Sequence, residues 1–130
     1  MKERSKEIFK NKISKSAYKK AVRSKEKFIR KFKDDSHVDY SVSIQENKVI
    51  GPILGVSDIR VGENGNDDFD LEKGIIVGNI RMGFGHYRIS MAIASCAHAL
   101  GYKPYWMDLN SYKDTTCTKV ISAQNDLYSG

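Results

Sequence analysis

The chain has 130 residues and a formal net charge of +6, and this charge is divided unevenly. Residues 1–33 contain 14 Lys and Arg against 3 Asp and Glu, whereas the remaining 97 residues contain 8 against 13. A basic head is therefore joined to a mildly acidic body. The length allows one ordinary domain and excludes a large multidomain enzyme within these residues.

The sequence carries no sign of membrane insertion or export. No apolar run approaches the roughly 18 residues that a membrane-spanning helix needs, and no apolar segment follows the basic N-terminus, so a secretory signal is not predicted. Cys96 and Cys117 form no CxxC pair, which is typical of free thiols in a reducing compartment. We expect a cytoplasmic protein, with peripheral attachment to the inner face of the membrane as the alternative.

Residues 1–36 are predicted to form a basic amphipathic helical arm. Between Lys2 and Lys33 there is no Pro or Gly, and apolar residues recur mostly every three to five positions, as on one stripe of a helix. The lysines opposite this stripe predict contact of residues 1–33 with an anionic membrane or with nucleic acid. The alternative is a solvated helix whose stripe packs on the rest of the protein.

Residues 37–73 have the pattern of a short antiparallel β segment followed by an acidic linker. Tyr40–Ile44 alternates apolar and polar residues, and Ile53–Val56 and Ile59–Val61 are short β-like runs. These runs predict a small meander. Gly62–Asp68 is rich in turn-forming and acidic residues, so we expect a domain boundary there.

Residues 74–130 are predicted to begin a Rossmann-like domain. Gly74–Ile80 is an apolar run typical of a strand in a parallel sheet, and it leads into a glycine loop at Arg81–His86. A helical pattern follows at Tyr87–Leu100, and Lys103–Leu109 reads as a second strand. The order strand, loop, helix, strand predicts a right-handed βαβ unit that opens a doubly wound α/β domain.

The helix of this unit is expected to end at Gly101, which suits a C′ position, and a further helix is expected at Thr118–Tyr128. Its packing surface is predicted from residues that recur with helical spacing: Ile89, Ala92, Ile93, Cys96, Ala97 and Leu100.

The glycine loop is the main candidate site. A glycine-rich turn that leads into a helix leaves backbone N–H groups at the positive helix end, where phosphate or another anion fits. Gly83 and Gly85 would let the backbone approach a ligand, and Arg81 and Arg88 could add charge-assisted hydrogen bonds. His86 is the candidate general base. The alternative is that His86 only caps the helix or bonds a neighbouring loop.

Several other chemistries are disfavoured. A Walker A loop needs Lys and then Ser or Thr after its glycine, but His86 and Tyr87 follow Gly85. A dinucleotide fingerprint would need glycine at position 88, which is Arg88, although Asp108 at the end of the second strand keeps this reading as a minor alternative.

No metal site is expected. Cys96, His98 and Cys117 have no standard zinc spacing. Cys96 is expected to be a small buried apolar residue, and Cys117 is expected to lie in a loop. Asn110 and Tyr112 lie just past the second strand, where ligands collect in such sheets, so they are candidates for contact with a substrate.

The segment Gly-Asn-Ile-Arg-Met-Gly-Phe-Gly-His-Tyr-Arg-Ile-Ser-Met-Ala, then Ala-His-Ala-Leu-Gly-Tyr and a strand ending Trp-Met-Asp-Leu, resembles the opening of GT-B glycosyltransferases. The likeness is to the monogalactosyldiacylglycerol synthase and MurG-like group, and it covers residues 74–112. Phe84 departs from it, since that group usually has a third glycine there. The resemblance implies sugar transfer from a nucleotide-sugar donor to a lipid-linked or other acceptor, with Gly83, Gly85, His86 and, less strongly, Arg88 at the site.

GT-B enzymes bind most of the donor nucleotide in a second, C-terminal domain. We therefore expect the chain to be the N-terminal fragment of a longer enzyme, inactive without the missing part. The nucleotide sugar is a co-substrate, and no other cofactor is implied. The alternative function is a basic module that binds nucleic acid or an anionic membrane and carries a non-catalytic α/β body.

Overall fold

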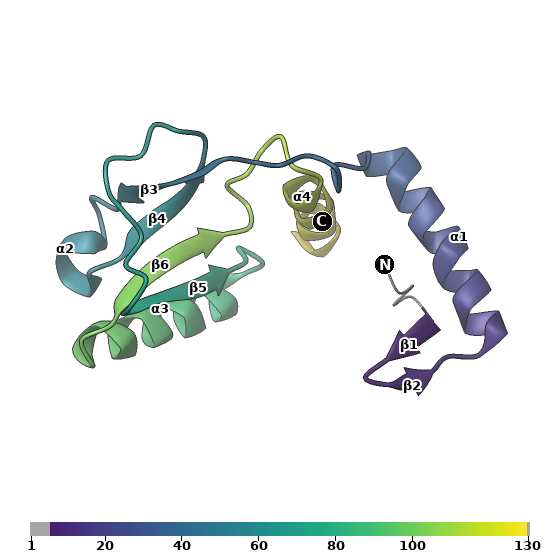
Figure 1. The fold of residues 1–130 in the computed structure, drawn as a ribbon, viewed down its shortest axis with the longest axis horizontal. Helices are drawn as coiled ribbons and strands as arrows, with labels where there is room; N and C mark the ends of the chain where they lie inside the picture. The colour runs from purple at the N-terminus through teal and green to yellow at the C-terminus, as the bar shows by residue number, and fades with distance from the viewer. Residues whose placement is uncertain (1–5, 130) are drawn as a thin grey trace. The chain divides into compact units, whose positions relative to one another are not determined.

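The computed structural model describes residues 6–129, and the chain divides into two compact units, Met1–Asp35 and Ser36–Gly130 (Figure 1). Residues 1–5 of the predicted arm, and Gly130, lie outside the described residues. The division at Asp35 follows the change from the basic head to the acidic body.

The first unit contains a short hairpin and one helix. Strands β1 (Glu7–Ile8) and β2 (Asn11–Lys12) pair antiparallel, and helix α1 covers Lys15–Phe32. The hydroxyl oxygen of Ser14 accepts a hydrogen bond from the N–H of Ala17 at 3.1 Å and so caps the helix. The helix therefore begins after Ser14, and the prediction of a helix over residues 7–12 was wrong.

The second unit is built on a mixed four-stranded sheet with the order β3-β4-β6-β5. Its strands are β3 (Val42–Glu46), β4 (Ser57–Val61), β5 (Gly74–Asn79) and β6 (Lys103–Asp108). β3 is antiparallel to β4, whereas β4 and β5 both run parallel to β6. This confirms an α/β architecture compatible with a Rossmann-like fold.

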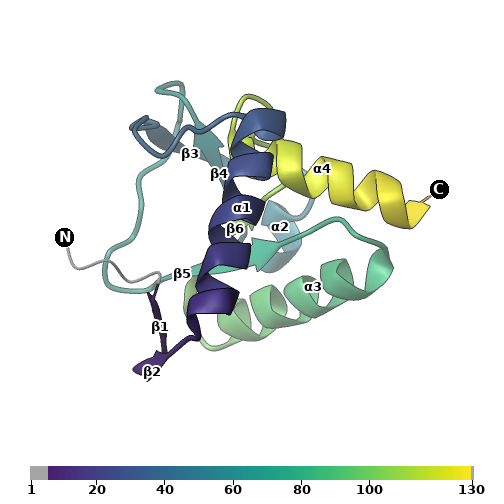
Figure 2. The same cartoon turned by 90° about the vertical axis from the view of Figure 1, so that its right-hand side faces the viewer.

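The predicted βαβ unit is present as β5, helix α3 (Phe84–Ala99) and β6. Gly101 follows the helix with φ of +83°, a left-handed conformation that glycine adopts without strain. Figures 1 and 2 show α3 lying along one face of the sheet, under β5 and β6. Helix α4 (Thr116–Ser129) lies beyond the carboxyl ends of these strands.

Residues 37–73 differ from the expected meander. Only β3 and β4 form an antiparallel pair, and Gly51–Leu54 forms the short helix α2 in place of a strand. β4 joins β6, with Ser57 opposite Tyr105. The acidic segment after β4 is therefore a connection within one unit, because the strands on both sides of it share a sheet.

The packing face of α3 is mostly not the one predicted. Ala97 is buried as expected, but the other buried residues are Ser90 and Ala94, whereas Ile89 and Ile93 are 60% and 50% exposed. Leu100 and Cys96 are exposed as well. Small residues let the helix approach the sheet closely, and the Ser90 hydroxyl donates to the Gly78 carbonyl of β5 at 2.9 Å.

The core lies between the sheet and the two helices α2 and α3. Its buried centre is Val56, Val77, Ala94 and Trp106, with Ile50, Leu54, Ile75 and Met91 packed against it. On the opposite face of the sheet, Tyr105 stacks on Phe69 at 4.3 Å between ring centroids, and its hydroxyl accepts from the N–H of Asp70. These contacts hold the parallel strands β4, β6 and β5 with their carboxyl ends at one edge.

Candidate functional site

The glycine loop connects the end of β5 to the first turn of α3. Gly83 is the N-cap residue, with φ of +82°, and no side chain caps the helix. The first turn of α3 has no acidic residue. The positive end of the helix is therefore neither capped by a side chain nor balanced by one of its own carboxylates.

Four of the predicted site residues lie together at this helix end. Gly83, Gly85, His86 and Arg88 are all exposed to solvent. Asn110 comes to the same loop from beyond β6, and its side-chain oxygen accepts from the main-chain N–H of Arg81 at 2.8 Å. Asn110 thus holds the glycine loop in place, and its contact with a substrate stays a prediction.

A pocket of about 350 Å³ lies beside this loop, at the carboxyl ends of the parallel strands. We call it the strand-end pocket. Residues of the turn before α2, of β4, β6 and their loops, and of α3 contribute to its wall: Asn47, Val49, Ile50, Asp58, Ile59, Arg60, Asn79, Arg81, Tyr87, Trp106, Asp108 and Ser111. Arg81 and Asp108, which the sequence analysis also named, are in this lining, whereas the main site candidates are not: Gly83, Gly85, His86, Arg88 and Asn110.

Two ion pairs set the charge of the strand-end pocket. Arg60 donates to Asp58 at 3.1 Å, and Arg81 donates to Asp108 at 2.5 Å. The other oxygen of Asp58 accepts from the Asn47 amide at 3.0 Å. Both carboxylates are mostly shielded from solvent, with side-chain exposures of 15% and 13%. The lining thus holds two positive and two negative side chains and has no net charge.

The lining of the pocket includes a buried amide. Asn79, the last residue of β5, is 2% exposed, and neither polar atom of its side chain has a hydrogen-bond partner among the described residues. Its main chain continues the parallel ladder, because its carbonyl accepts from the N–H of Leu109 at 3.0 Å. Buried polar side chains almost always have a partner, so this amide needs an explanation.

Aromatic side chains form the apolar part of the wall. Trp106 of β6 is 5% exposed, and Tyr87 of α3 meets it edge-to-face with ring centroids 5.9 Å apart. Outside the lining, the Tyr112 hydroxyl donates to the carbonyl of Ile59 at 3.0 Å. Burial, and then the negative charge of Asp108, raise the pKa of Tyr112 above its usual value.

Comparison with known families matches residues 7–130 to the family described as Domain of unknown function (DUF6937). The chain belongs to this family. No curated protein and no solved structure matches it. The match spans both units, so the basic helix and the strand-end pocket are both parts of the DUF6937 domain.

Sequence reasoning named two residues of this DUF6937 pocket, Arg81 and Asp108, and missed the others. Asn79 ends β5 as Asp108 ends the neighbouring strand β6, and a polar residue at that position was the available signal. Asp58 and Arg60 could not be found in this way, because the sequence predicts that their strand belongs to a small meander apart from the βαβ unit. Only the pairing of β4 with β6 brings these two side chains to the pocket.

Both predictions about where the cysteines lie were wrong. Within residues 6–129, no three His, Cys, Asp or Glu side chains gather in a way that could hold a metal ion. Cys96 is exposed, so the prediction of a buried thiol was wrong, and Cys117 lies in α4 and not in a loop. No helix in the described part of the DUF6937 chain is long and apolar enough to cross a membrane.

Proposed function

We propose that this DUF6937 chain supplies the first-loop half of a GT-B type glycosyltransferase, which transfers sugar from a nucleotide-sugar donor to a lipid-linked or other acceptor. The observation that carries the proposal is the strand-end pocket beside the glycine loop. It lies where ligands bind in open α/β sheets, outside the carboxyl ends of parallel strands. The donor-binding domain would come from outside these 130 residues.

In this proposal each loop residue has a defined part. The uncapped N-terminus of α3 at Gly83, together with Arg88, favours a donor phosphate. The exposed imidazole of His86, in the first turn of α3, accepts the proton of the acceptor hydroxyl as that oxygen attacks the anomeric carbon of the sugar. The bond from this carbon to the diphosphate breaks at the same time, and the nucleoside diphosphate leaves with the electron pair. Gly85 leaves this turn without a side chain that would hinder the approach of a ligand.

The test is a transfer assay with the protein in its natural context, together with whatever polypeptide carries the donor-binding domain. Labelled UDP-sugars serve as donors and a total lipid extract as acceptor. His86→Ala should lower turnover by about 10²–10⁴-fold, as expected for a general base. His37→Ala is the control, since His37 is exposed and outside the pocket lining. An unchanged rate for His86→Ala would remove His86 from the mechanism, and no transfer with any nucleotide sugar would refute the proposal.

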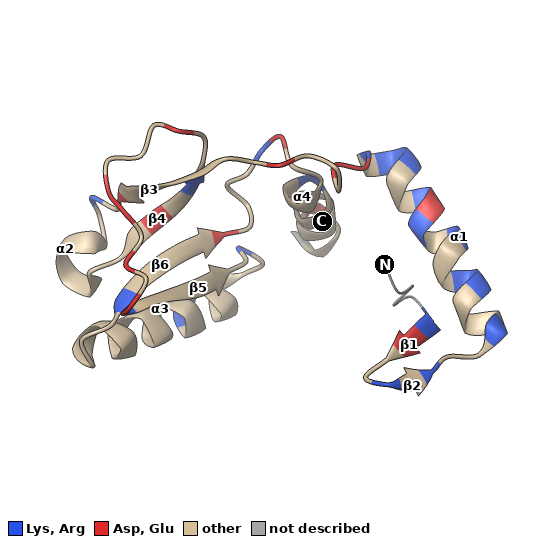
Figure 3. Ribbon diagram, viewed as in Figure 1, with Lys and Arg blue, Asp and Glu red and all other residues tan. Residues whose placement is uncertain are grey.

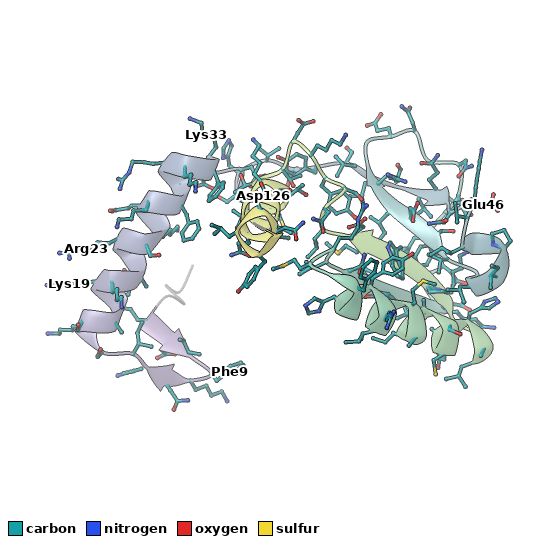
Figure 4. The ribbon with its side chains drawn as sticks, turned by 180° about the vertical axis from the view of Figure 1, so that it is seen from behind. Phe9, Lys19, Arg23, Lys33, Glu46 and Asp126 are labelled. Atoms are coloured by element: carbon teal, nitrogen blue, oxygen red, sulfur yellow. The ribbon has the colours of Figure 1, made fainter. Side chains whose placement is uncertain are left out.

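A second function is proposed for the basic helix α1, namely attachment to an anionic membrane surface. Between Lys15 and Phe32 the helix has eight Lys and Arg against one Glu, and none of its residues is buried. Figure 3 shows basic residues along its whole length, and Figure 4 shows Lys19 and Arg23 on the same side. The aromatic rings of Phe28 and Phe32 stack with centroids 5.8 Å apart, which gives the helix an apolar end.

Vesicle binding tests this second function. The whole chain should bind vesicles that contain phosphatidylserine and not neutral phosphatidylcholine vesicles, and binding should weaken with salt. Lys19→Glu with Arg23→Glu should reduce binding by at least tenfold, since each basic residue near such a surface contributes about 1 kcal/mol. Lys113→Glu with Lys119→Glu, in the second unit, is the matched control. Equal losses in both pairs, or preference for RNA over vesicles, would contradict the assignment.

A further inference from the structure

The lining of the strand-end pocket indicates which class of molecule it can hold. A volume of about 350 Å³ is at the lower end of the range for small-molecule sites. The lining combines apolar and aromatic residues with polar and charged ones. This combination suits a small ring that has an apolar face and several polar groups.

The charge of the lining argues against a phosphate group. The two guanidinium groups, of Arg60 and Arg81, are already paired with Asp58 and Asp108. An anion placed here would meet two carboxylates as well as two cations, so the lining offers it no net attraction. A neutral ligand is not repelled by the two carboxylates.

The same ion pairs keep hydrogen-bonding capacity of both kinds. A carboxylate has about four acceptor sites and a guanidinium has five N–H donors. The described contacts use two acceptor sites of Asp58, from Asn47 and Arg60, and two of Asp108. Hydroxyl groups donate and accept, so they match a lining with remaining acceptors and donors side by side.

Asn79 adds a second, independent observation. Asn79 belongs to the pocket lining, and its amide offers two donors and an acceptor with no partner among the described residues. Two adjacent hydroxyl groups of one ring would satisfy it, one by accepting and one by donating. Because both polar atoms are buried, contact with a ligand requires this side chain to turn toward the pocket.

Trp106 and Tyr87 supply the surface for the other face of the ring. Both line the pocket, and they meet edge-to-face, so that their rings form a corner. The C–H groups of a sugar ring can pack on such aromatic surfaces while the hydroxyl groups stay in contact with Asp58, Asp108 and Asn79.

We propose that the strand-end pocket binds a neutral polyhydroxylated ring, such as a monosaccharide unit, with Asn79, Asp58 and Asp108 as its hydrogen-bonding groups. This inference deepens the proposed function and rests on it only for the role of the ring as part of the acceptor. The binding itself requires no donor and no second domain.

The experiment titrates the 130-residue chain with methyl glycosides of glucose, galactose and N-acetylglucosamine, and with inorganic phosphate. Trp106 is the chain's one tryptophan, so its fluorescence reports directly on the pocket. At least one glycoside should bind saturably in the millimolar range and change this signal, and phosphate should not compete. Asn79→Leu and Asp58→Asn should each weaken binding tenfold or more, whereas Asn64→Leu, at an exposed position outside the lining, should not.

Several results would overturn the inference. These are competition by phosphate, absence of saturable glycoside binding, or unchanged affinity in both pocket variants when their circular dichroism shows a folded protein. The transferase proposal is judged separately, by the effect of His86→Ala on sugar transfer. A chain that binds no glycoside but loses transfer with His86→Ala would refute the pocket assignment and leave the proposed function in place.

Discussion

Replacing Asn79 by Leu should make the protein more stable. The amide at the end of β5 is removed from water, and no described residue offers it a hydrogen bond. A buried polar group without a partner costs about 1–3 kcal/mol of stability. Leucine has a similar size and no polar atoms, so it removes this cost without leaving a large cavity.

The expected gain is smaller than the full cost of the amide. The branch of leucine must fit the space that the amide fills, and such a change of shape costs up to about 1.5 kcal/mol. We therefore expect the free energy of unfolding to rise by about 1 kcal/mol. For a unit that covers residues 36–130, this corresponds to an increase in Tm of roughly 4–8 °C.

The assay is urea denaturation at pH 7, followed by Trp106 fluorescence and by circular dichroism. Asn64→Leu is the matched control, since Asn64 is exposed, and its effect should stay within about 0.5 kcal/mol. A decrease of 1 kcal/mol or more for Asn79→Leu would show that the amide has a partner in solution. In that case the argument from an unsatisfied polar group would fail. A gain in stability together with weaker glycoside binding would mark Asn79 as a residue kept for function.

Three further substitutions, the first with a control variant in the same strand, test the packing and the electrostatics of the second unit. Gly74→Ala should lower the free energy of unfolding by about 1–3 kcal/mol, because a Cβ there would lie 2.3 Å from the Asp70 carbonyl oxygen. Gly78→Ala, in the same strand, is the control. A Cβ at Gly78 would have no described atom within 4 Å, so this change should be neutral or slightly stabilising. Tyr112→Phe should cost about 0.5–1.5 kcal/mol at pH 7, since it removes the hydrogen bond to β4. Because the pKa of Tyr112 is raised from 10.0, its stabilising effect is present below pH 10 and is lost as the pH rises through the folded-state value, so the difference in urea midpoint should shrink above pH 10. Asp70→Asn should be less stable than the wild type at pH 7, and this difference in stability should be smaller at pH 3. The main-chain N–H groups of Lys73 and Glu72 donate to Asp70 and lower its pKa below 3.8, so its stabilising effect is lost as the pH falls through that lowered value. An equal difference at both pH values would contradict this origin.

The βαβ unit could be predicted from the sequence because its signals are local. An apolar run, a glycine loop and a helical pattern ending at Gly101 occupy consecutive residues, and each follows from backbone geometry and short-range periodicity. The same local chemistry explains the start of α1, where Ser14 acts as the cap. That signal was present in the sequence and was overlooked in favour of a longer apolar stripe.

The packing face of α3 could not be predicted from periodicity, because two stripes of the helix consist of apolar or small residues and either could face the sheet. The stripe with Ile89 and Ile93 has the larger side chains, yet Ser90 and Ala94 face the sheet. Burial of large residues and close approach of the backbones compete in such a helix. The outcome depends on the sheet against which it packs.

By itself, the sequence determined the basic arm, the βαβ order and the position of the glycine loop, all of which follow from neighbouring residues. Only the tertiary structure decided that β4 joins β6, which brings Asp58 into one pocket with Asn79 and Asp108. Strand pairing across more than 40 positions depends on which buried surfaces fit together in three dimensions. No local pattern carries that information, and for this reason the loop was found in the sequence and the pocket beside it was not.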